Sequence, residues 1–138
     1  MIQPDSPFVL IQALATMGRS SLLERLAKLG HSDVGMPDIK LLWCLGDDPL
    51  NVQQAAEMMG TTKQFAARTV TKLRDAGLLE VKTFPSDRRA SAITATPKGA
   101  DLIAIVAKER DAIEQEWLSR LGSEKLAGVT GGLAALLA

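Results

Sequence analysis

The sequence predicts a mainly α-helical chain with one small β-hairpin and a long helix towards each end. Apolar residues recur at helical spacing over residues 7–29 and again over about 25 residues from residue 97. Two shorter helical patterns with a glycine between them lie in the middle, and after Gly77 the apolar period becomes that of extended strands. With 138 residues, 46% of them apolar and 4% aromatic, the chain suits one globular domain with an aliphatic core.

The first long helix is predicted for residues 7–29. Ser6 can cap its amino end, and Pro7 suits the first helical position, where the missing N–H costs no hydrogen bond. Gly30 is expected to end this helix. A loop then leads to a second helix over residues 37–45.

Two short helices are predicted next. Asn51 and Gln54 form a capping-box pattern at the start of the first one, and Gly60 is expected to end it. The second is capped at residues 61–62 and runs to about residue 76. Its predicted core stripe consists of Ala66, Thr69, Val70 and Leu73. Two helices of this length with a tight turn between them form a helix-turn-helix.

The change of period after the helix-turn-helix predicts a β-hairpin. Residues 78–84 and 90–95 are the two extended runs, and residues 85–89 are a turn-rich tip that carries arginines. Thr96 and Pro97 then restart a helix as its N-cap and first residue.

The long terminal helices carry more apolar surface than a small helix-turn-helix can cover. A last helix, capped by Ser123, is predicted over residues 126–137. Because apolar stripes of this kind must be buried, we expect a homodimer with its interface in residues 7–29 and 97–137. A monomer that folds these arms back on itself is the alternative.

Charge is unevenly distributed, although the formal net charge is zero. Residues 61–98 carry eight Lys or Arg and three Asp or Glu, whereas the remaining residues carry eight and thirteen. A locally basic segment in a neutral protein indicates a site for a polyanion. The alternative is an ordinary solvated face of mixed charge.

The remaining composition excludes several classes of protein. The single cysteine, Cys44, allows no intrachain disulfide and no cysteine-based metal cluster, and the single His31 is no metal site. No catalytic Ser/His/Asp set, paired-carboxylate signature or glycine-rich phosphate loop is visible, so we expect no enzyme, no cofactor and no metal. The apolar amino-terminal stretch follows Asp5 rather than a basic leader, and no window is long enough to span a bilayer. A cytoplasmic location without membrane contact is expected.

Three motifs follow one another with a spacing typical of one family. They are G-L-L-E at residues 77–80, D-R-R-A at residues 87–90 and T-P-K-G at residues 96–99. Together with the order of the helices, they resemble the MarR family of winged-helix transcription regulators, in its recognition-helix exit, its wing and the start of its dimerisation helix. The likeness is clear over residues 37–121 and extends to both ends only as a helical pattern.

The resemblance implies three parts and a function. Residues 1–36 would form a dimerisation helix and loop, residues 37–96 a winged helix-turn-helix that binds DNA, and residues 97–138 the carboxyl-terminal dimerisation helices. The chain would bind a pseudo-palindromic double-stranded DNA operator as a homodimer and regulate transcription, with repression as the expected mode. A winged-helix module for protein contacts, without sequence-specific DNA binding, is the alternative.

The recognition helix presents a predicted base-reading face. With the core stripe of this helix turned inward, the outward-pointing residues are Gln64, Arg68 and Thr71. The flanking residues are Phe65, Ala67 and Lys72. Gln suits adenine and Arg suits guanine in the major groove. For the Phe65 ring two roles remain open, contact with a thymine methyl group or packing against Thr62 and Thr69.

The remaining contacts to DNA are predicted at the wing and the backbone. Arg89 is expected in the minor groove, with Asp87 bracing its guanidinium and Arg88 beside it. An alternative for Asp87 is a turn residue that bonds its own backbone. The predicted phosphate contacts are Thr62, Lys63, Lys72 and Lys82.

A small aromatic or phenolic ligand is a further partner that the resemblance implies. Met17, Trp43 and Trp117 are the candidate pocket residues, and a role in the apolar core is their alternative. Cys44 lies in an apolar helix without basic neighbours, which favours an inert thiol over an oxidant sensor.

Overall fold

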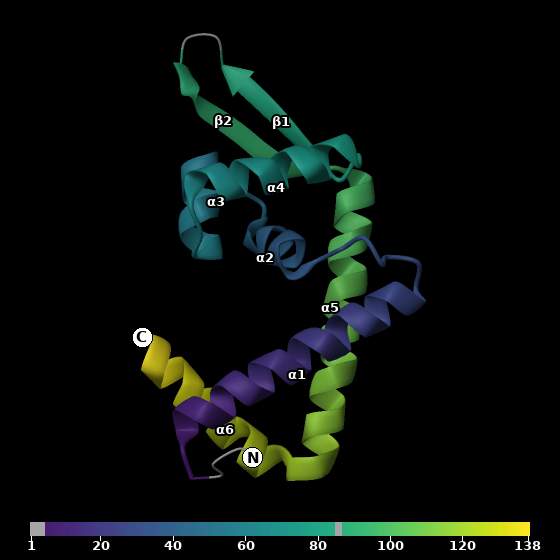
Figure 1. Ribbon diagram of the computed structural model, residues 1–138, viewed down its shortest axis with the longest axis vertical. Helices are drawn as coiled ribbons and strands as arrows, with labels where there is room; N and C mark the ends of the chain where they lie inside the picture. Colours follow the sequence, from purple (N-terminus) through teal and green to yellow (C-terminus); the bar gives the residue numbers. More distant parts are fainter. Residues whose placement is uncertain (1–4, 85–86) are drawn as a thin grey trace. The chain divides into compact units, whose positions relative to one another are not determined.

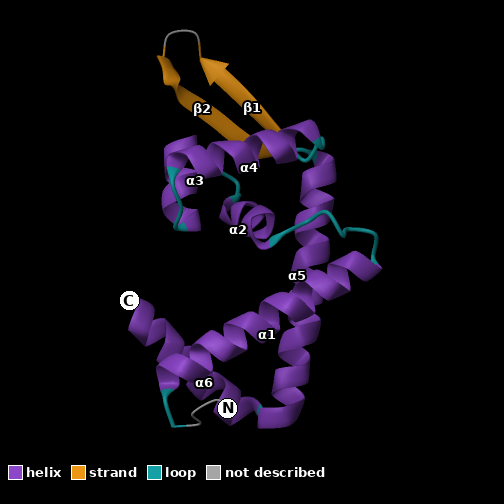
Figure 2. Ribbon diagram, in the orientation of Figure 1, coloured by secondary structure: helices purple, strands orange, loops and turns teal. Residues whose placement is uncertain are grey.

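The computed structural model describes residues 5–84 and 87–138; the side chains of residues 84 and 87–90 also lie outside the description. The described residues form six helices and one β-hairpin (Figures 1 and 2). The elements are α1 (Pro7–Lys28), α2 (Met36–Cys44), α3 (Val52–Met59), α4 (Lys63–Asp75), β1 (Leu79–Phe84), β2 (Asp87–Ala95), α5 (Pro97–Leu121) and α6 (Ser123–Leu137). The mainly helical class with one hairpin is therefore confirmed.

The chain divides into two units. One comprises residues up to Leu22 and from Ala107 onward, and the other comprises Leu23–Val106. The first unit contains most of α1, the second half of α5 and all of α6, in which every residue but the half-buried Leu126 is exposed.

The second unit holds the core of the fold. Its largest fully buried side chains are Leu26, Ile39, Leu41, Leu42, Ile93 and Val106. The helices α2, α3 and α4 pack on one another, and β1 packs against α4. The predicted stripe of α4 is buried at all four of its positions, which confirms the inward face of this helix.

Local capping signals are confirmed where hydrogen bonds can be assigned. The Asn51 side chain accepts from the Gln54 N–H at 2.8 Å, while the Gln54 side chain accepts from the Asn51 N–H at 3.0 Å. Thr62 caps α4 by accepting from the Phe65 N–H at 3.1 Å. Ser6 accepts from the N–H of Val9 at 3.4 Å, as its predicted cap position requires.

The hairpin is antiparallel, with Leu79 opposite Ala95 and Phe84 opposite Asp87. The pairing shows that the prediction of a turn over residues 85–89 was wrong in extent, because β2 begins at Asp87 and includes Arg88 and Arg89. A register shift between Thr83 and Phe84 accompanies this extension of the ladder towards the tip.

A third segment joins the root of the hairpin. Leu50, just before α3, and Ile93 of β2 form an isolated antiparallel bridge. Each donates to the other, at 3.2 Å from the Leu50 N–H and 2.7 Å from the Ile93 N–H. The root of the hairpin is therefore tied to the entry of the helix-turn-helix.

The end of α4 and the start of α5 meet at what we call the α4–α5 junction, residues 76–78 and 96–99. Thr96 donates through its N–H to the Leu78 carbonyl at 3.1 Å and through its hydroxyl to the Gly77 carbonyl at 2.6 Å. The Lys98 ammonium donates to the Ala76 carbonyl at 2.9 Å. Gly77 has φ +77°, the left-handed conformation predicted for it.

One cap differs from its prediction. Gly122, with φ 82° and ψ 162°, occupies the N-cap position of α6, and Ser123 is already its first helical residue. Only glycine adopts this backbone conformation readily. The break between α5 and α6 is thus a single residue rather than the loop that a start at residue 126 implied.

Candidate nucleic-acid interface

The two helices of the helix-turn-helix are joined by a short turn with defined ends. The helix α3 ends at Gly60, which has φ 69° and donates to the last carbonyls of that helix. Three residues after Gly60, α4 begins at Lys63, directly after the Thr62 cap. With one face of α4 buried against its neighbours, the opposite face remains in solvent.

The outward face of α4 carries the three residues predicted for it. Gln64, Arg68 and Thr71 are all exposed. The Thr71 hydroxyl donates to the Ala67 carbonyl at 3.0 Å, and Ala67 itself is half-buried. Among the three outward residues, Gln64 and Arg68 therefore keep the larger unused hydrogen-bonding capacity towards a ligand, because the Thr71 proton is already donated.

Phe65 contacts Arg68 on the surface of α4. The guanidinium carbon of Arg68 lies 5.7 Å from the centroid of the Phe65 ring, a cation–π distance. The ring is 37% exposed. The Phe65 ring therefore contacts Arg68 within α4. Its contact with a thymine methyl group and its packing against Thr62 and Thr69 both remain predictions.

The predicted phosphate contacts differ in their surroundings. Thr62, Lys63 and Lys82 are exposed. The Lys72 ammonium instead donates to the Asp38 carboxylate at 2.6 Å and to the Asp33 carbonyl at 3.0 Å. Lys72 thus holds a contact within the protein that its position in the sequence did not suggest.

The wing residues Asp87, Arg88 and Arg89 lie in β2, and their side chains belong to the part of the chain outside the description. The roles predicted for these three side chains therefore remain predictions.

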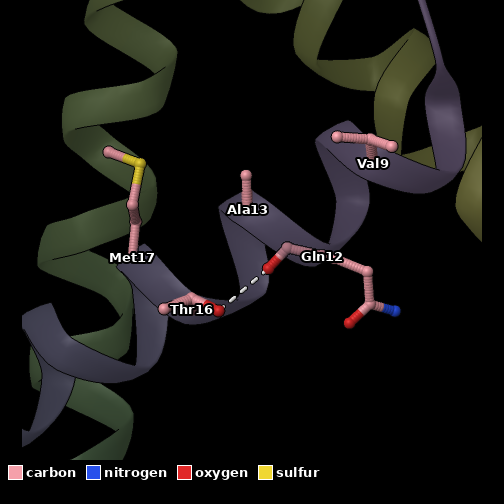
Figure 3. Close-up of a pocket in the computed structure, with 5 residues that line it drawn as sticks. All are labelled: Val9, Gln12, Ala13, Thr16 and Met17. Carbon is pink, nitrogen blue, oxygen red and sulfur yellow. Dashed lines mark hydrogen bonds between the residues drawn. The ribbon is translucent and has the colours of Figure 1, made fainter. Parts of the chain in front are cut away.

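The candidate pocket residues lie in different units. Met17, 64% exposed, lies on an open face of α1 together with Val9 and Ala13, and Figure 3 shows these three side chains on the same side of the helix. Trp117 belongs to the same unit and is half-buried. Trp43, 46% exposed, belongs to the other unit and lines a shallow recess between α2 and α3. A ligand pocket formed by all three residues remains a prediction.

Cys44 lines the same recess as Trp43. Its thiol donates to the Lys40 carbonyl at 3.0 Å, and burial raises the pKa of this thiol above its ordinary value. Because the thiolate is the reactive form, the raised pKa lowers the reactivity of Cys44 at neutral pH.

Sequence reasoning did not find the contact between Asp38 and Lys72. One signal was available, since Asp38 lies three residues after Gly35 and accepts from its N–H at 2.8 Å, as an acidic residue in the first turn of a helix can. Nothing in the sequence paired Asp38 with a lysine 34 residues away.

The described residues offer neither a metal-binding cluster nor a membrane-spanning helix. None of their His, Cys, Asp and Glu side chains form a group of three or more that could hold a metal ion. None of their helices combines the length and the apolar character that a membrane crossing needs.

The chain is similar in sequence to proteins of the MarR family. The model of the MarR family matches residues 32–90. The chain is 35% identical over 107 residues to the uncharacterized HTH-type transcriptional regulator YhjH of Bacillus subtilis, an alignment that covers 73% of this chain and 61% of that protein. The chain therefore spans less than two thirds of the length of this relative.

Solved structures show the same fold. A MarR-family transcriptional regulator from Rhodococcus sp. RHA1 superposes with a TM-score of 0.78 at 19% identity, covering 93% of this chain and 89% of that one. CouR from Rhodococcus jostii RHA1, whose structure contains p-coumaroyl-CoA, superposes with a TM-score of 0.77 at 21% identity, covering 96% and 92%.

Proposed function

The chain belongs to the MarR family, and from that premise we propose that it is a transcriptional regulator that binds double-stranded DNA sequence-specifically. The observation that carries this proposal is the outward face of α4, which holds Gln64 and Arg68 in solvent while the opposite face is buried. The amino-terminal part of the second helix of a helix-turn-helix is the part that enters the major groove.

Each outward residue has a role in this proposal. Gln64 bonds adenine and Arg68 bonds guanine, and each contact is worth roughly 1–3 kcal/mol of discrimination between bases. Thr71, Phe65 and Ala67 complete the surface that faces the groove.

Backbone and wing contacts complete the proposed interface. The exposed Thr62, Lys63 and Lys82 bind phosphates, which position the protein without reading sequence. In the wing, Arg89 enters the minor groove, with Asp87 and Arg88 as its neighbours in β2.

We propose that the protein acts as a homodimer on a pseudo-palindromic operator. In a single copy of the chain, the first unit exposes large apolar side chains to water. Among them are Phe8 at 74%, Leu136 at 75% and Leu137 at 89% exposure. The others on its two terminal helices are Leu10, Ile11, Leu14, Met17, Val129 and Leu133. A second copy buries this surface, and two-fold symmetry then presents two recognition helices to two half-sites. Sedimentation at micromolar concentration should give the mass of a dimer, and a monomer would refute this part of the proposal.

Binding to a labelled duplex taken from around the protein's own gene tests the DNA-reading role. Arg68→Ala should weaken binding to this duplex by about 1–3 kcal/mol and leave binding to a scrambled duplex nearly unchanged. Lys63→Ala should weaken both and reduce the log–log salt slope by about one unit. Arg74→Ala is the matched control, because it removes the same charge from the last turn of α4, where Arg74 contacts Asp75 at 3.4 Å.

Two results would contradict this proposal. If the parent protein binds the native and scrambled duplexes equally at every salt concentration, a module for protein contacts becomes the better explanation of the fold. If Arg68→Ala and Lys63→Ala behave alike, the division between base reading and phosphate contact is wrong.

We also propose that the protein represses transcription and releases DNA when it binds a small aromatic ligand. The fold shared with CouR and the apolar side chains of Met17, Trp43 and Trp117 support this. The chain has two tryptophans, so ligand binding can be followed by their fluorescence. Titration with p-coumaroyl-CoA or free p-coumarate should quench the parent, and the variants Trp43→Phe and Trp117→Phe should show which tryptophan responds. No change in fluorescence or DNA affinity at millimolar p-coumarate would exclude this ligand class.

A further inference from the structure

A buried carboxylate lies beneath the recognition helix. Asp38, in the first turn of α2, is 3% exposed. One of its oxygens, Oδ2, accepts from the Gly35 N–H at 2.8 Å and from the Lys72 ammonium at 2.6 Å. The charge of this carboxylate is therefore compensated by one α4 lysine, whose side chain remains 52% exposed.

The same ammonium makes a second contact. Lys72 Nζ donates to the Asp33 carbonyl at 3.0 Å, in the loop between α1 and α2. The Lys72 side chain thus links α4 to two other parts of the second unit, the loop before α2 and the first turn of α2. Lys72 lies one helical turn after Arg68 on α4, so its fixation also limits the rotation of the base-reading face.

We propose that Asp38 and Lys72 are positioning residues that set the orientation of α4 for DNA reading, an inference that rests on the proposed function and deepens it. The Lys72 ammonium has three N–H donors, and two of them already bond the Asp38 carboxylate and the Asp33 carbonyl. Movement of α4 that breaks the pair leaves the buried Asp38 carboxylate without its counter-charge, whereas the half-exposed Lys72 ammonium can be solvated by water. The arrangement therefore favours one placement of α4 over nearby alternatives. The competing role, direct phosphate binding by the exposed part of Lys72, is the one that the sequence suggested.

The substitution Asp38→Asn separates the two roles by the sign of its effect. If Lys72 binds phosphate, loss of the carboxylate frees the ammonium and removes a negative charge, so binding to every duplex tightens. If the pair positions α4, affinity for the native duplex falls about tenfold, the change that about 1.4 kcal/mol produces, and affinity for a scrambled duplex is nearly unchanged. The matched control is Asp33→Asn, which removes an equal charge from the loop just before α2 and leaves the Asp33 carbonyl in place.

The substitution Lys72→Met tests the other partner. It is the harsher variant for folding, because it leaves the buried Asp38 carboxylate with the Gly35 N–H but without its counter-charge. Positioning predicts a loss confined to the native duplex with an unchanged salt slope, whereas phosphate binding predicts a loss on both duplexes and a slope lower by about one unit. In the double variant the two losses should not add, because both remove the same interaction.

Hydrogen exchange measured without DNA makes the test independent of the proposed function. Amides of residues 33–38 should exchange faster in Asp38→Asn and in Lys72→Met than in the parent, and at the parent rate in Asp33→Asn. Unchanged exchange in both variants, or tighter DNA binding by Asp38→Asn, would overturn the positioning role. Failure of the parent protein to prefer its native duplex would instead refute the proposed function, and the exchange rates would still show whether the pair fixes the loop.

Discussion

Gly99 at the α4–α5 junction has no room for a side chain. A Cβ atom built on this residue would overlap the carbonyl oxygen of Leu78 and lie 3.0 Å from its carbonyl carbon, at the limit that real Cβ atoms observe. The obstacle is backbone, which cannot rotate away as a flexible side chain can. The substitution Gly99→Ala should therefore push the first turn of α5 away from residue 78.

The expected cost follows from the bonds at that junction. Thr96 and Lys98 make three hydrogen bonds to residues 76–78, between 2.6 and 3.1 Å long. A shift on the order of 1 Å would bring these bonds beyond good hydrogen-bonding distance. Three bonds at about 1 kcal/mol each give about 3 kcal/mol, and the better helix propensity of Ala returns up to about 1 kcal/mol. The net loss in the free energy of unfolding should be about 2 kcal/mol.

Urea denaturation followed by circular dichroism, at one fixed protein concentration, measures this loss. The matched control is Gly46→Ala in the same unit, because nothing lies within 4 Å of a Cβ there and its φ is outside the left-handed region. This control should be neutral or should stabilise by up to about 1 kcal/mol. A free energy of unfolding for Gly99→Ala within about 0.5 kcal/mol of the parent value would refute this prediction. It would mean that the α4–α5 junction accommodates the Cβ atom without losing its hydrogen bonds.

Three further predictions concern the cap, the wing and the thiol. Asn51→Ala should lower the free energy of unfolding by about 1 kcal/mol, because it removes the side chain that caps α3; an unchanged urea midpoint would contradict this. In DNA-binding titrations at fixed salt, Arg89→Ala should lose about 1–3 kcal/mol of affinity, and Asp87→Ala should lose part of that although it removes a negative charge. Tighter binding by Asp87→Ala would show that Asp87 does not brace the arginine. Burial raises the pKa of the Cys44 thiol. Near neutral pH this thiol should therefore react with a disulfide reagent more slowly in the folded protein than in urea, and the rate in the folded protein should rise only at higher pH. Equal rates in the folded and unfolded protein would refute this.

The sequence was sufficient to predict features whose cause is local. The capping box at Asn51 and the cap at Thr62 depend on residues three positions apart, and the left-handed Gly77 follows from the end of α4. The outward face of α4 follows from helix geometry alone once its buried stripe is known. These signals sufficed to locate the helix-turn-helix and its exposed residues.

Other features depend on contacts between distant residues. The pair of Asp38 and Lys72 arises because α2 packs on α4, which no periodicity reveals. The early start of β2 depends on the pairing of Phe84 with Asp87, where turn-forming residue types suggested a longer loop. At the start of α6, the N-cap is Gly122, whose torsion angles suit glycine, and not Ser123, although serine is a preferred N-cap residue.

The bridge between Leu50 and Ile93 has a consequence for the order of folding. It closes a loop that contains α3, α4 and nearly the whole hairpin, whereas each of those elements is held by contacts close in sequence. Closing a long loop costs chain entropy before its contacts repay it, so the bridge should form late, after the local elements exist. Contacts absent from the transition state slow unfolding rather than accelerate folding. The fully buried Ile93 should therefore slow unfolding without affecting the rate of folding. In stopped-flow measurements, Ile93→Val should accelerate unfolding and leave the refolding rate almost unchanged. Slower refolding would instead place the bridge in the folding nucleus.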